Sequence, residues 1–486
     1  MKMATEILET IGDKMNSKSI IFIFFVLLIN SIYSQNYNDA IRVGAPGLGM
    51  NARALGMGNS YISLSDDGSA SYFNPAGLGL VKRLEFLGGL DISFFNNNST
   101  FFGNKINSSE SQTRLSNASF TFPIPTIQGS LVFGLSYNST KDLIGSNQFN
   151  GFNPFNHSKI QSLLNTDIPY DLYLTNDNGD STIINGRLNQ SGNILNSGAI
   201  NNWTLSGAIE AYKNLFIGGS LSIISGSYTS DFDYYEEDTK NIYQGITAPG
   251  YPKTTDFRLF YLKNLLNWDI EGWNAKLGFL YQFSKSARLG FTLQFPKIFK
   301  IKEKFIVEAE SEFANWSTSI KSEKYSDEVK YDIKTPFEVA GGLSINFKGF
   351  ILSGQLNLVN YTELEFSNAE GLKASYISEQ NKKIKSLLRQ TLDFNFGFEY
   401  TIPKFGLRVR GGYLQQGSPF KDDPADFNKK FITTGLGFLV DGVFGVDLGY
   451  AYGWWKDIGD NYGTNLSRTF QDINYHKFLI STTYRF

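Results

Sequence analysis

Histidine is the side chain that most often carries acid–base chemistry near neutral pH, and this chain of 486 residues has two. His476 follows Asp472 by four positions, so an Asp-His dyad of a hydrolytic enzyme is conceivable. His157 lies far from both in the sequence, which is a poor basis for a compact metal or haem site. We interpret each histidine as a solvated polar residue. The chain is therefore predicted to have no catalytic residue, no enzymatic activity and no cofactor.

A second group that could do chemistry is a run of carboxylates, Asp231, Asp233, Glu236, Glu237 and Asp238. Carboxylate oxygens are the ligands that Ca²⁺ and Mg²⁺ prefer in proteins. The spacing of this run does not match the loop of an EF-hand, however. We therefore expect a solvated loop and no metal site.

Four charged residues alternate with apolar ones in a predicted hairpin, namely Asp393, Glu399, Arg408 and Arg410. All four should point to the face of the hairpin that is opposite its apolar residues. We predict that they form a polar network, with Asp393 near Arg410 across the hairpin. The functional alternative is that an arginine binds the carboxylate of a ligand.

The elements that position these side chains are predicted from composition to be strands. Phe, Trp and Tyr make up 15% of the chain, and 47 glycines accompany only 13 prolines, which is typical of many strands and turns. The 44 basic and 46 acidic residues nearly balance, so nothing favours a nucleic-acid partner. The chain has no cysteine, which excludes disulfides and thiolate metal sites.

The segment TPFEVAGGLSINFKGFILSGQLNLVNY shows the strand pattern most clearly, because apolar residues occupy every second position. A two-residue turn at Lys348-Gly349 would bring apolar partners together on one face. The predicted pairs are Phe347 with Phe350, Ile345 with Leu352, Leu343 with Gly354, Gly341 with Leu356 and Val339 with Leu358. Residues 392–413 and 432–454 repeat this pattern around further short turns.

Alternation alone would also fit a soluble sandwich, in which one face of each sheet is buried. Strands of ten residues or more, aromatic clusters at their ends and short turns opposite long connections favour a barrel in a membrane. We predict an all-β fold, a transmembrane antiparallel β-barrel of about 14 strands that contacts outer-membrane lipid. Residues 139–200 and 229–255 are predicted to be long loops.

The N-terminus predicts export. From Met15, which could be the true start, the chain has Lys18, a short apolar run and a small residue, Ser34, before a plausible cleavage site. A membrane anchor is the alternative, but the apolar run is only about half the roughly 20 residues that a spanning helix needs. We predict a signal peptide at 1–34, a plug at 35–80 and the barrel at 81–486.

The chain ends on HKFLISTTYRF, in which Tyr484 and Phe486 share one face of the predicted last strand. This ending resembles the C-terminal assembly signal of bacterial outer-membrane barrels. The resemblance implies a place in the bacterial outer membrane and the barrel assembly machinery as a partner during biogenesis.

The Gly-rich stretch DDGSASYFNPAGLG lies just before LEFLGGLDISFF, the first segment that is clearly predicted to be a strand. It resembles the signature that ends the plug of the FadL/TodX outer-membrane transport family, on Asn74, Pro75, Ala76, Gly77 and Leu78. A more modest interpretation is that these residues only turn the chain into the first strand. The resemblance covers about two thirds of the chain and omits both predicted long loops.

This resemblance implies a monomeric channel for the passive uptake of hydrophobic small molecules, such as long-chain fatty acids or aromatic hydrocarbons. The ligand would be captured outside the cell, pass to a site above the plug and leave sideways through the wall. The alternative is a barrel of the PorV type, which anchors partners of a secretion system and transports nothing. An apolar path along the inner face would discriminate between the two.

Overall fold

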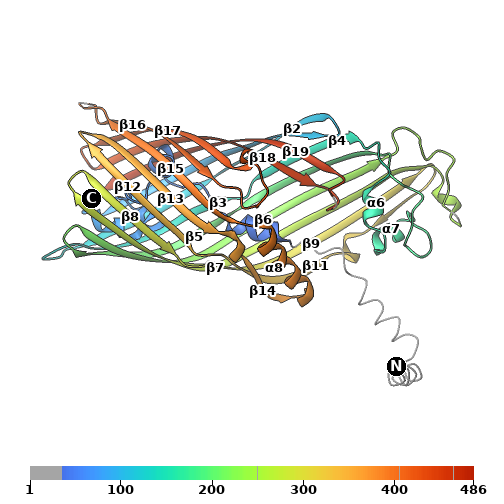
Figure 1. Ribbon diagram of the computed structural model, residues 1–486, viewed down its shortest axis with the longest axis horizontal. Coiled ribbons are helices and arrows are strands. Elements are labelled where there is room, and N and C mark those ends of the chain that lie inside the picture. The colour runs from blue at the N-terminus through green and yellow to red at the C-terminus, as the bar shows by residue number, and fades with distance from the viewer. Residues whose placement is uncertain (1–35, 249, 404, 464) are drawn as a thin grey trace, which may run out of the picture.

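The computed structural model describes residues 36–248, 250–403, 405–463 and 465–486. The predicted signal peptide at 1–34 lies outside these residues. In the described part, strands dominate and form one sheet that closes on itself, because β1 pairs with both β2 and β19. Figure 1 shows the resulting long barrel, with the plug helices inside it.

The described residues contain 19 strand segments in antiparallel pairing. They are β1 (Glu85–Phe101), β2 (Asn104–Ile124), β3 (Leu131–Asp142), β4 (Gly145–Phe152), β5 (Asn189–Tyr212), β6 (Leu215–Glu237), β7 (Phe257–Ser284), β8 (Ala287–Gln294), β9 (Ile298–Phe313), β10 (Ser317–Ile320), β11 (Asp327–Lys334), β12 (Glu338–Phe347), β13 (Phe350–Asn360), β14 (Glu365–Glu370), β15 (Gln390–Thr401), β16 (Leu407–Gln416), β17 (Lys429–Val440), β18 (Phe444–Asp460) and β19 (Arg468–Arg485). Four pairs of consecutive segments, β3/β4, β8/β9, β11/β12 and β13/β14, each form one crossing, and β10 is a short extra arm. The barrel wall therefore has the predicted 14 strands.

The register of the hairpin β12–β13 confirms the pairs predicted from its alternation. Phe347 lies opposite Phe350, and Val339 lies opposite Leu358. The turn between the strands is made by Lys348 and Gly349, both with positive φ. A two-residue turn of this kind matches the twist of the flanking strands, so it fixes the register of the whole hairpin.

The outer surface carries an apolar belt that runs around the barrel. Phenylalanines and leucines that would be buried in a soluble protein are about half exposed here, as Phe396 (48%) and Leu448 (46%) show. Such a belt on a closed barrel is the surface that outer-membrane proteins present to lipid. Further members are Phe86, Leu90, Phe94, Phe120, Leu135, Leu205, Leu221, Leu277, Phe279, Leu289, Phe291, Leu343, Ile345, Leu352, Leu356, Ile432, Leu436, Phe438, Phe478 and Ile480.

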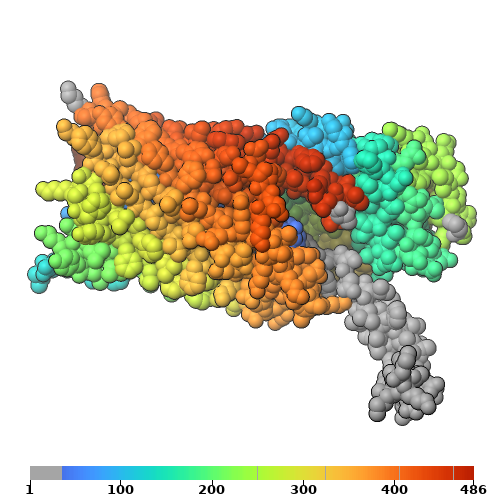
Figure 2. Space-filling model, viewed as in Figure 1, coloured from blue at the N-terminus to red at the C-terminus, as the bar shows by residue number. Residues whose placement is uncertain are grey.

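The two ends of the barrel differ. The end that carries Lys213-Asn214 and Lys348-Gly349 has short connections, and we call it the turn end. The opposite end, which we call the loop end, carries α6 (Lys159–Ser162), α7 (Asp167–Asp171) and α8 (Ala374–Leu387). Figure 2 shows that the teal and green segments around α6 and α7 project farther along the barrel than α8.

The prediction of long loops at 139–200 and 229–255 is wrong in part. β3 continues to Asp142, β4 follows, and β5 begins at Asn189. β6 runs to Glu237, so the first third of the second region is also strand. These strands extend beyond the apolar belt, where outward residues are polar, so the alternation on which the prediction depended is lost there.

The segment between the described N-terminus and β1 folds inside the barrel. It contains α3 (Tyr37–Gly44), α4 (Ala52–Gly56), α5 (Ala70–Phe73) and a 3₁₀ helix, η1 (Pro75–Leu80). Further one-turn 3₁₀ helices are η2 (Pro252–Thr254), η3 (Ser322–Lys324), η4 (Tyr361–Glu363) and η5 (Ala425–Phe427). No helix among the described residues is long and apolar enough to cross a membrane.

Candidate functional site

The plug signature forms a compact turn against the inner wall. Asn74 Nδ2 donates hydrogen bonds to the carbonyl oxygens of Ile62, at 2.9 Å, and of Phe279 on β7, at 3.0 Å. Pro75 begins η1, where its fixed φ suits the first helical position. Gly77 has no space for a side chain, because an added Cβ would lie 1.8 Å from the Ser65 carbonyl oxygen. The signature therefore joins plug to wall through the Asn74 side chain, and Gly77 allows close packing within the plug.

Glycines of the wall provide the seat for the plug. An added Cβ would lie 2.5 Å from Ala76 N at Gly218, and 2.2 Å from the Met57 carbonyl oxygen at Gly397. Gly412 and Gly449 lie equally close to plug backbone. These glycines come from β6, β15, β16 and β18, so several strands of the wall contact the plug backbone. We call these four glycines the glycine seat.

Ion pairs lock the same region. Arg53 of the plug donates to Glu399 on β15 at 3.0 Å and to Asp66 of the plug at 2.7 Å. Arg410, which is fully buried, donates to Glu399 at 2.7 Å and to Asp447 on β18 at 2.6 Å. We call these five residues the plug lock. Each charge in it has an opposite partner, as buried charges require.

Asp66, the aspartate that the plug contributes to the plug lock, favours its ionised form. Burial alone would favour the protonated form of Asp66, but the guanidinium groups of Arg53 and Arg288 outweigh it and lower the pKa of this carboxyl below its ordinary range. Arg288 on β8 donates to Asp66 at 3.1 Å. The plug is therefore tied by charge to two strands of the wall, β8 and β15.

The structure brings together two of the four residues of the predicted polar network. Glu399 and Arg410 lie opposite each other in the β15–β16 ladder and form an ion pair. The predicted neighbour of Arg410, Asp393, is instead six positions away along β15 and accepts from the backbone N–H of Gly417 at 2.8 Å. The prediction failed because it placed the turn of this hairpin too early in the register. Arg408 forms no ion pair within the described residues.

Toward the loop end the interior becomes apolar. Trp268 and Tyr228 pack with ring centroids 4.8 Å apart, and the guanidinium of Arg42 on α3 lies 4.6 Å from the Tyr228 ring. Inward residues of the neighbouring strands continue this surface. They include Ile270, Phe299, Ile301, Val307, Val329, Tyr331, Ile333, Val359 and Phe366, and α6 and α7 cover them with Ile160, Leu163, Ile168 and Leu172. We call this region the loop-end lumen.

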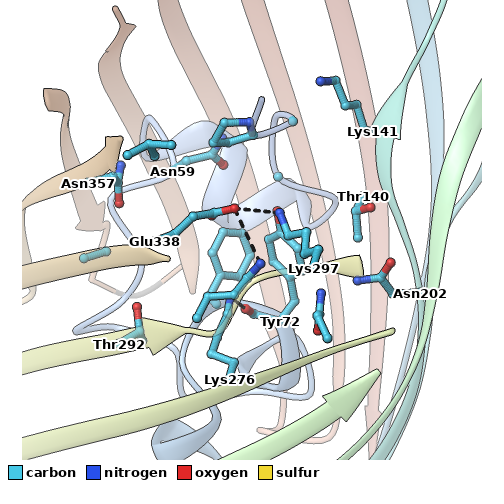
Figure 3. A pocket seen from close by; sticks show the side chains of 18 of the residues that line it. Asn59, Tyr72, Thr140, Lys141, Asn202, Lys276, Thr292, Lys297, Glu338 and Asn357 are labelled. Atoms are coloured by element: carbon cyan, nitrogen blue, oxygen red, sulfur yellow. Dashed lines mark hydrogen bonds and ion pairs between the residues drawn. The ribbon is translucent and has the colours of Figure 1, made fainter. Parts of the chain in front are cut away.

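A cavity of 140 Å³ lies between the loop-end lumen and the plug (Figure 3). Its apolar lining includes Val43, Ile200, Phe299 and Val359, which also belong to the loop-end lumen. Its polar lining includes Thr140, Asn202, Thr204, Ser222, Asn274, Thr292, Gln294, Asn357 and Asn395. The cavity is therefore the place where the apolar interior meets polar groups.

Three lysines line this cavity, and they are unevenly neutralised. Lys297 forms an ion pair with Glu338 at 2.7 Å. Lys141 donates to the Ala45 carbonyl oxygen at 2.7 Å, and Lys276 donates to the carbonyl oxygen of Tyr72. Neither Lys141 nor Lys276 forms an ion pair in the part of the chain that the structure describes. A carboxylate would be a stronger acceptor for either lysine than a neutral carbonyl oxygen is, so the cavity is suited to an anionic group.

The wall beside the cavity is interrupted. The ladder between β2 and β3 stops at Asn117 opposite Asn138, and within the described residues the rest of β2 pairs with β1 alone. Beyond this point β3 and β4 bend inward, so that Asn97 on the inner face of β1 donates to the Ser146 carbonyl oxygen at 2.9 Å. Side chains, rather than backbone hydrogen bonds, therefore close the wall between β2 and β3. We call this place the wall break.

The structure places the two histidines beside aromatic and amide side chains. His476 Nδ1 is 2.8 Å from the Tyr450 hydroxyl, and no hydrogen bond joins His476 to Asp472 in the described residues. His157 is hydrogen-bonded to Asn153 and stacks on Phe155.

The acidic run belongs to the end of β6 and the connection after it, not to a free loop. Asp231 forms an ion pair with Lys263 on β7 at 2.9 Å, whereas Glu236 is buried and accepts from the backbone of α6. Within the described residues, no group of three or more His, Asp or Glu side chains could hold a metal ion. The run therefore serves to anchor the loop end.

Sequence reasoning missed the three cavity lysines. Lys276 carried a usable signal, because it occupies an inward position in the alternating segment WNAKLGFLY, whose outward residues are apolar. Lys141 carried none, since it lies in the region taken for a loop. Lys297 lies between β8 and β9, where the alternation is broken.

Comparisons with known proteins agree with this architecture. No protein-family model matches the chain, and no curated protein matches it. Among solved structures, the Pseudomonas putida toluene transporter TodX is similar, with 14% identity, a TM-score of 0.54 and coverage of 90% of this chain and 99% of that one.

A FadL homologue of Pseudomonas aeruginosa is similar over 91% of this chain and all of its own, with 12% identity and a TM-score of 0.56. The CymD monoaromatic hydrocarbon channel is similar over 90% of this chain and 98% of its own, with 15% identity and a TM-score of 0.52. The fold that the plug signature implied is therefore confirmed. Two of these three neighbours are a toluene transporter and a monoaromatic hydrocarbon channel.

Proposed function

We propose that this protein is an outer-membrane channel of the FadL/TodX type for the passive entry of hydrophobic small molecules. The observation that carries the proposal is the position of the cavity, which shares apolar lining residues with the packed loop-end lumen on one side and borders the plug on the other. A purely anchoring barrel of the PorV type needs no such apolar path. No catalysed reaction belongs to the proposal.

We further infer that the preferred ligands are amphiphiles with an anionic head, such as long-chain fatty acids. An apolar cavity of about 150 Å³ can bind benzene, so the volume here would also accept an aromatic hydrocarbon. The lining argues against that ligand, because burying Lys141 and Lys276 against a neutral ring would leave both charges without an anion. A carboxylate in the cavity would satisfy them, and the chain of a fatty acid would extend along Val43 and Phe299.

The exit that fits this geometry is sideways. The glycine seat and the plug lock hold the plug on several strands, which blocks a straight path to the turn end. The wall break adjoins the cavity, because Thr140 and Lys141 line the cavity and also follow Asn138 on β3. Apolar residues Leu90 and Phe94 face outward at the same level of β1, so a ligand leaving there would enter lipid directly.

The test is uptake of labelled oleate and labelled toluene by cells that lack their own importers and carry this chain. We expect oleate uptake well above that of empty cells and a weaker effect on toluene. Lys276→Met should lower the affinity for oleate about tenfold, the effect of losing one charge-assisted hydrogen bond. Lys302→Met is the matched control, because Lys302 is half exposed on the outer face near the rim.

Deletion of residues 36–80 should abolish the preference for oleate and admit hydrophilic solutes. A folded, membrane-inserted barrel that takes up neither compound would refute transport and favour the anchoring function. Equal responses of oleate uptake to Lys276→Met and Lys302→Met would refute the anionic ligand class.

A further inference from the structure

The wall break begins at the last pair of the β2–β3 ladder, and several polar side-chain atoms at this edge lack hydrogen-bond partners among the described residues. Asn117 and Asn138, the last pair of the β2–β3 ladder, each have a buried side-chain amide atom without a hydrogen-bond partner among the described residues. The hydroxyl of Ser139, the next residue on β3, is in the same condition. Buried polar atoms are rarely left without partners, and each one costs free energy in the closed arrangement. The closed wall is therefore not optimised at this edge.

One side chain reaches across the wall break. Arg114 on β2 donates from Nη2 to Asp142 Oδ2 on β3 at 3.2 Å and from Nη1 to the Lys141 carbonyl oxygen at 3.4 Å. Arg114 also donates from Nε and Nη2 to Asp91 of β1, both at 3.2 Å. Asp91 fixes the guanidinium to the β1–β2 hairpin, and only the bonds to β3 cross the break.

The other charged group that faces this site is Lys477 on β19. It forms ion pairs with Asp91 and, at 3.4 Å, with Asp142, and the Tyr475 hydroxyl also donates to Asp142. Two cations thus face two carboxylates. Asp91 and Lys477 are almost completely removed from solvent, and Arg114 keeps 12% of its side chain accessible. Asp142 is the most exposed of the four charges, with 19% of its side chain accessible. It is also the one that β3 carries.

The bridge is connected to the cavity through Lys141. Its carbonyl oxygen accepts from Arg114, whereas its ammonium holds the Ala45 carbonyl oxygen of the plug. The plug segment that follows is packed directly on β3, because an added Cβ at Gly47 would lie 2.1 Å from the Thr140 carbonyl oxygen. Ala45, Gly47, Thr140 and Lys141 all line the cavity. An occupant of the cavity therefore contacts both partners of this plug–β3 contact.

We propose that Arg114 is the latch of the wall break, a positioning residue that holds β3 against β2 until a ligand arrives. The proposal rests on the proposed function, since it assumes that ligands leave sideways. An anionic head in the cavity competes with the Ala45 carbonyl for the ammonium of Lys141. Lys141 then moves, its backbone carbonyl leaves Arg114, and β3 separates from β2 while Asp91 retains Arg114. Lys477 remains to neutralise Asp142 during this movement.

The first test measures oleate uptake with Arg114→Gln and with Asp142→Asn. Both changes remove the ion pair across the break, and both leave Asp91 with a cationic partner. We expect the maximal rate to rise up to about tenfold, which corresponds to the loss of one partly buried ion pair. The oleate concentration for half-maximal uptake should change little, because the cavity is intact. The double variant should be no faster than either single one.

The matched control is Lys263→Gln. Lys263 forms an ion pair with Asp231 between β6 and β7, at 2.9 Å, and an unbroken ladder joins those strands. Its uptake rate should equal that of the unaltered chain. Folding of every variant is checked by the mobility of unheated barrel in detergent electrophoresis.

The second test does not depend on transport. The chain has no cysteine, so Ser116→Cys places a single thiol in the buried stretch of β2 beside the break. In the purified barrel, Arg114→Gln should accelerate its reaction with N-ethylmaleimide about tenfold, whereas Lys263→Gln should leave the reaction rate unchanged.

The two readouts separate the two proposals. No oleate uptake by any variant, with faster thiol labelling after Arg114→Gln, would refute the transport function and retain the latch. A folded Arg114→Gln variant with unchanged labelling would overturn the latch, whatever its uptake. Lower uptake in both latch variants would overturn it as well, because a latch that is removed cannot slow the exit.

Discussion

The interior of the barrel differs between the loop-end lumen and the half nearer the turn end, although the same strands line both. Toward the loop end, Trp268, Tyr228 and their neighbours fill the barrel with large apolar side chains. Toward the turn end, the glycines of the glycine seat let the plug backbone lie directly on the wall, and the ion pairs of the plug lock join plug and wall. Apolar packing is non-directional and tolerates rearrangement, whereas close backbone contacts and buried ion pairs require one geometry. We infer that the loop-end lumen can adapt to a ligand while the half nearer the turn end stays closed.

The largest expected effect lies in the plug lock. Glu399→Gln leaves Arg53 and Arg410 without the carboxylate that they share, so unfolding should become easier by about 3–5 kcal/mol. Urea unfolding in lipid vesicles, followed by tryptophan fluorescence, measures this change. Glu328→Gln removes the partner of Lys302 from an exposed pair and should cost less than about 1 kcal/mol. Equal losses would mean that the plug lock does not hold the closed half.

A smaller effect on stability, but a larger one on conductance, is expected at the glycine seat. Gly397→Val places a side chain where Met57 backbone now lies, at a strain of about 1–3 kcal/mol. The plug should shift and the barrel should conduct ions in planar bilayers. Gly354→Val is the control, because an added Cβ at Gly354 meets nothing within 4 Å. A silent Gly397→Val channel would contradict the view that this contact seals the turn end.

The smallest effect should come from the loop-end lumen. Ile301→Val removes one buried methylene from β9 and should cost about 1 kcal/mol in the same unfolding measurement. Ion conductance should stay at its basal level, because the seal lies elsewhere. Raised ion conductance in this variant would contradict the view that the seal lies near the turn end and not in the loop-end lumen.

Sequence patterns predicted the parts of the barrel that local geometry controls. In β12–β13 the alternation and the two-residue turn at Lys348-Gly349 fixed every pair from Phe347–Phe350 to Val339–Leu358. They did so because one face of each strand must meet lipid, and a slip of one residue would turn that face inward. Beyond the apolar belt this constraint disappears. That is why β4 and the upper parts of β5 and β6 were taken for loops.

The candidate site was less accessible to the same reasoning. Glu399 and Arg410 were assigned to one network, yet the second cation that Glu399 binds, Arg53, lies more than 300 positions away in the plug. The pairing of Asp393 with Arg410 was wrong, because a small error in the turn moves every cross-strand pair. Roles for Asn74 to Leu78 in plug function and for Tyr484 and Phe486 in assembly stay predictions, although η1 and β19 now contain most of these residues.

The sequence by itself determined that this chain forms a closed barrel with an apolar exterior. The reason is that every second residue of a strand faces lipid, so the pattern can be read from neighbouring residues. Only the tertiary structure decided what lies inside. Lys141, Lys276 and Glu338 come to one cavity from three different strands, and Arg114 meets Asp142 where two strands no longer pair. Such contacts depend on where closure and the plug place each strand, and no local pattern records that.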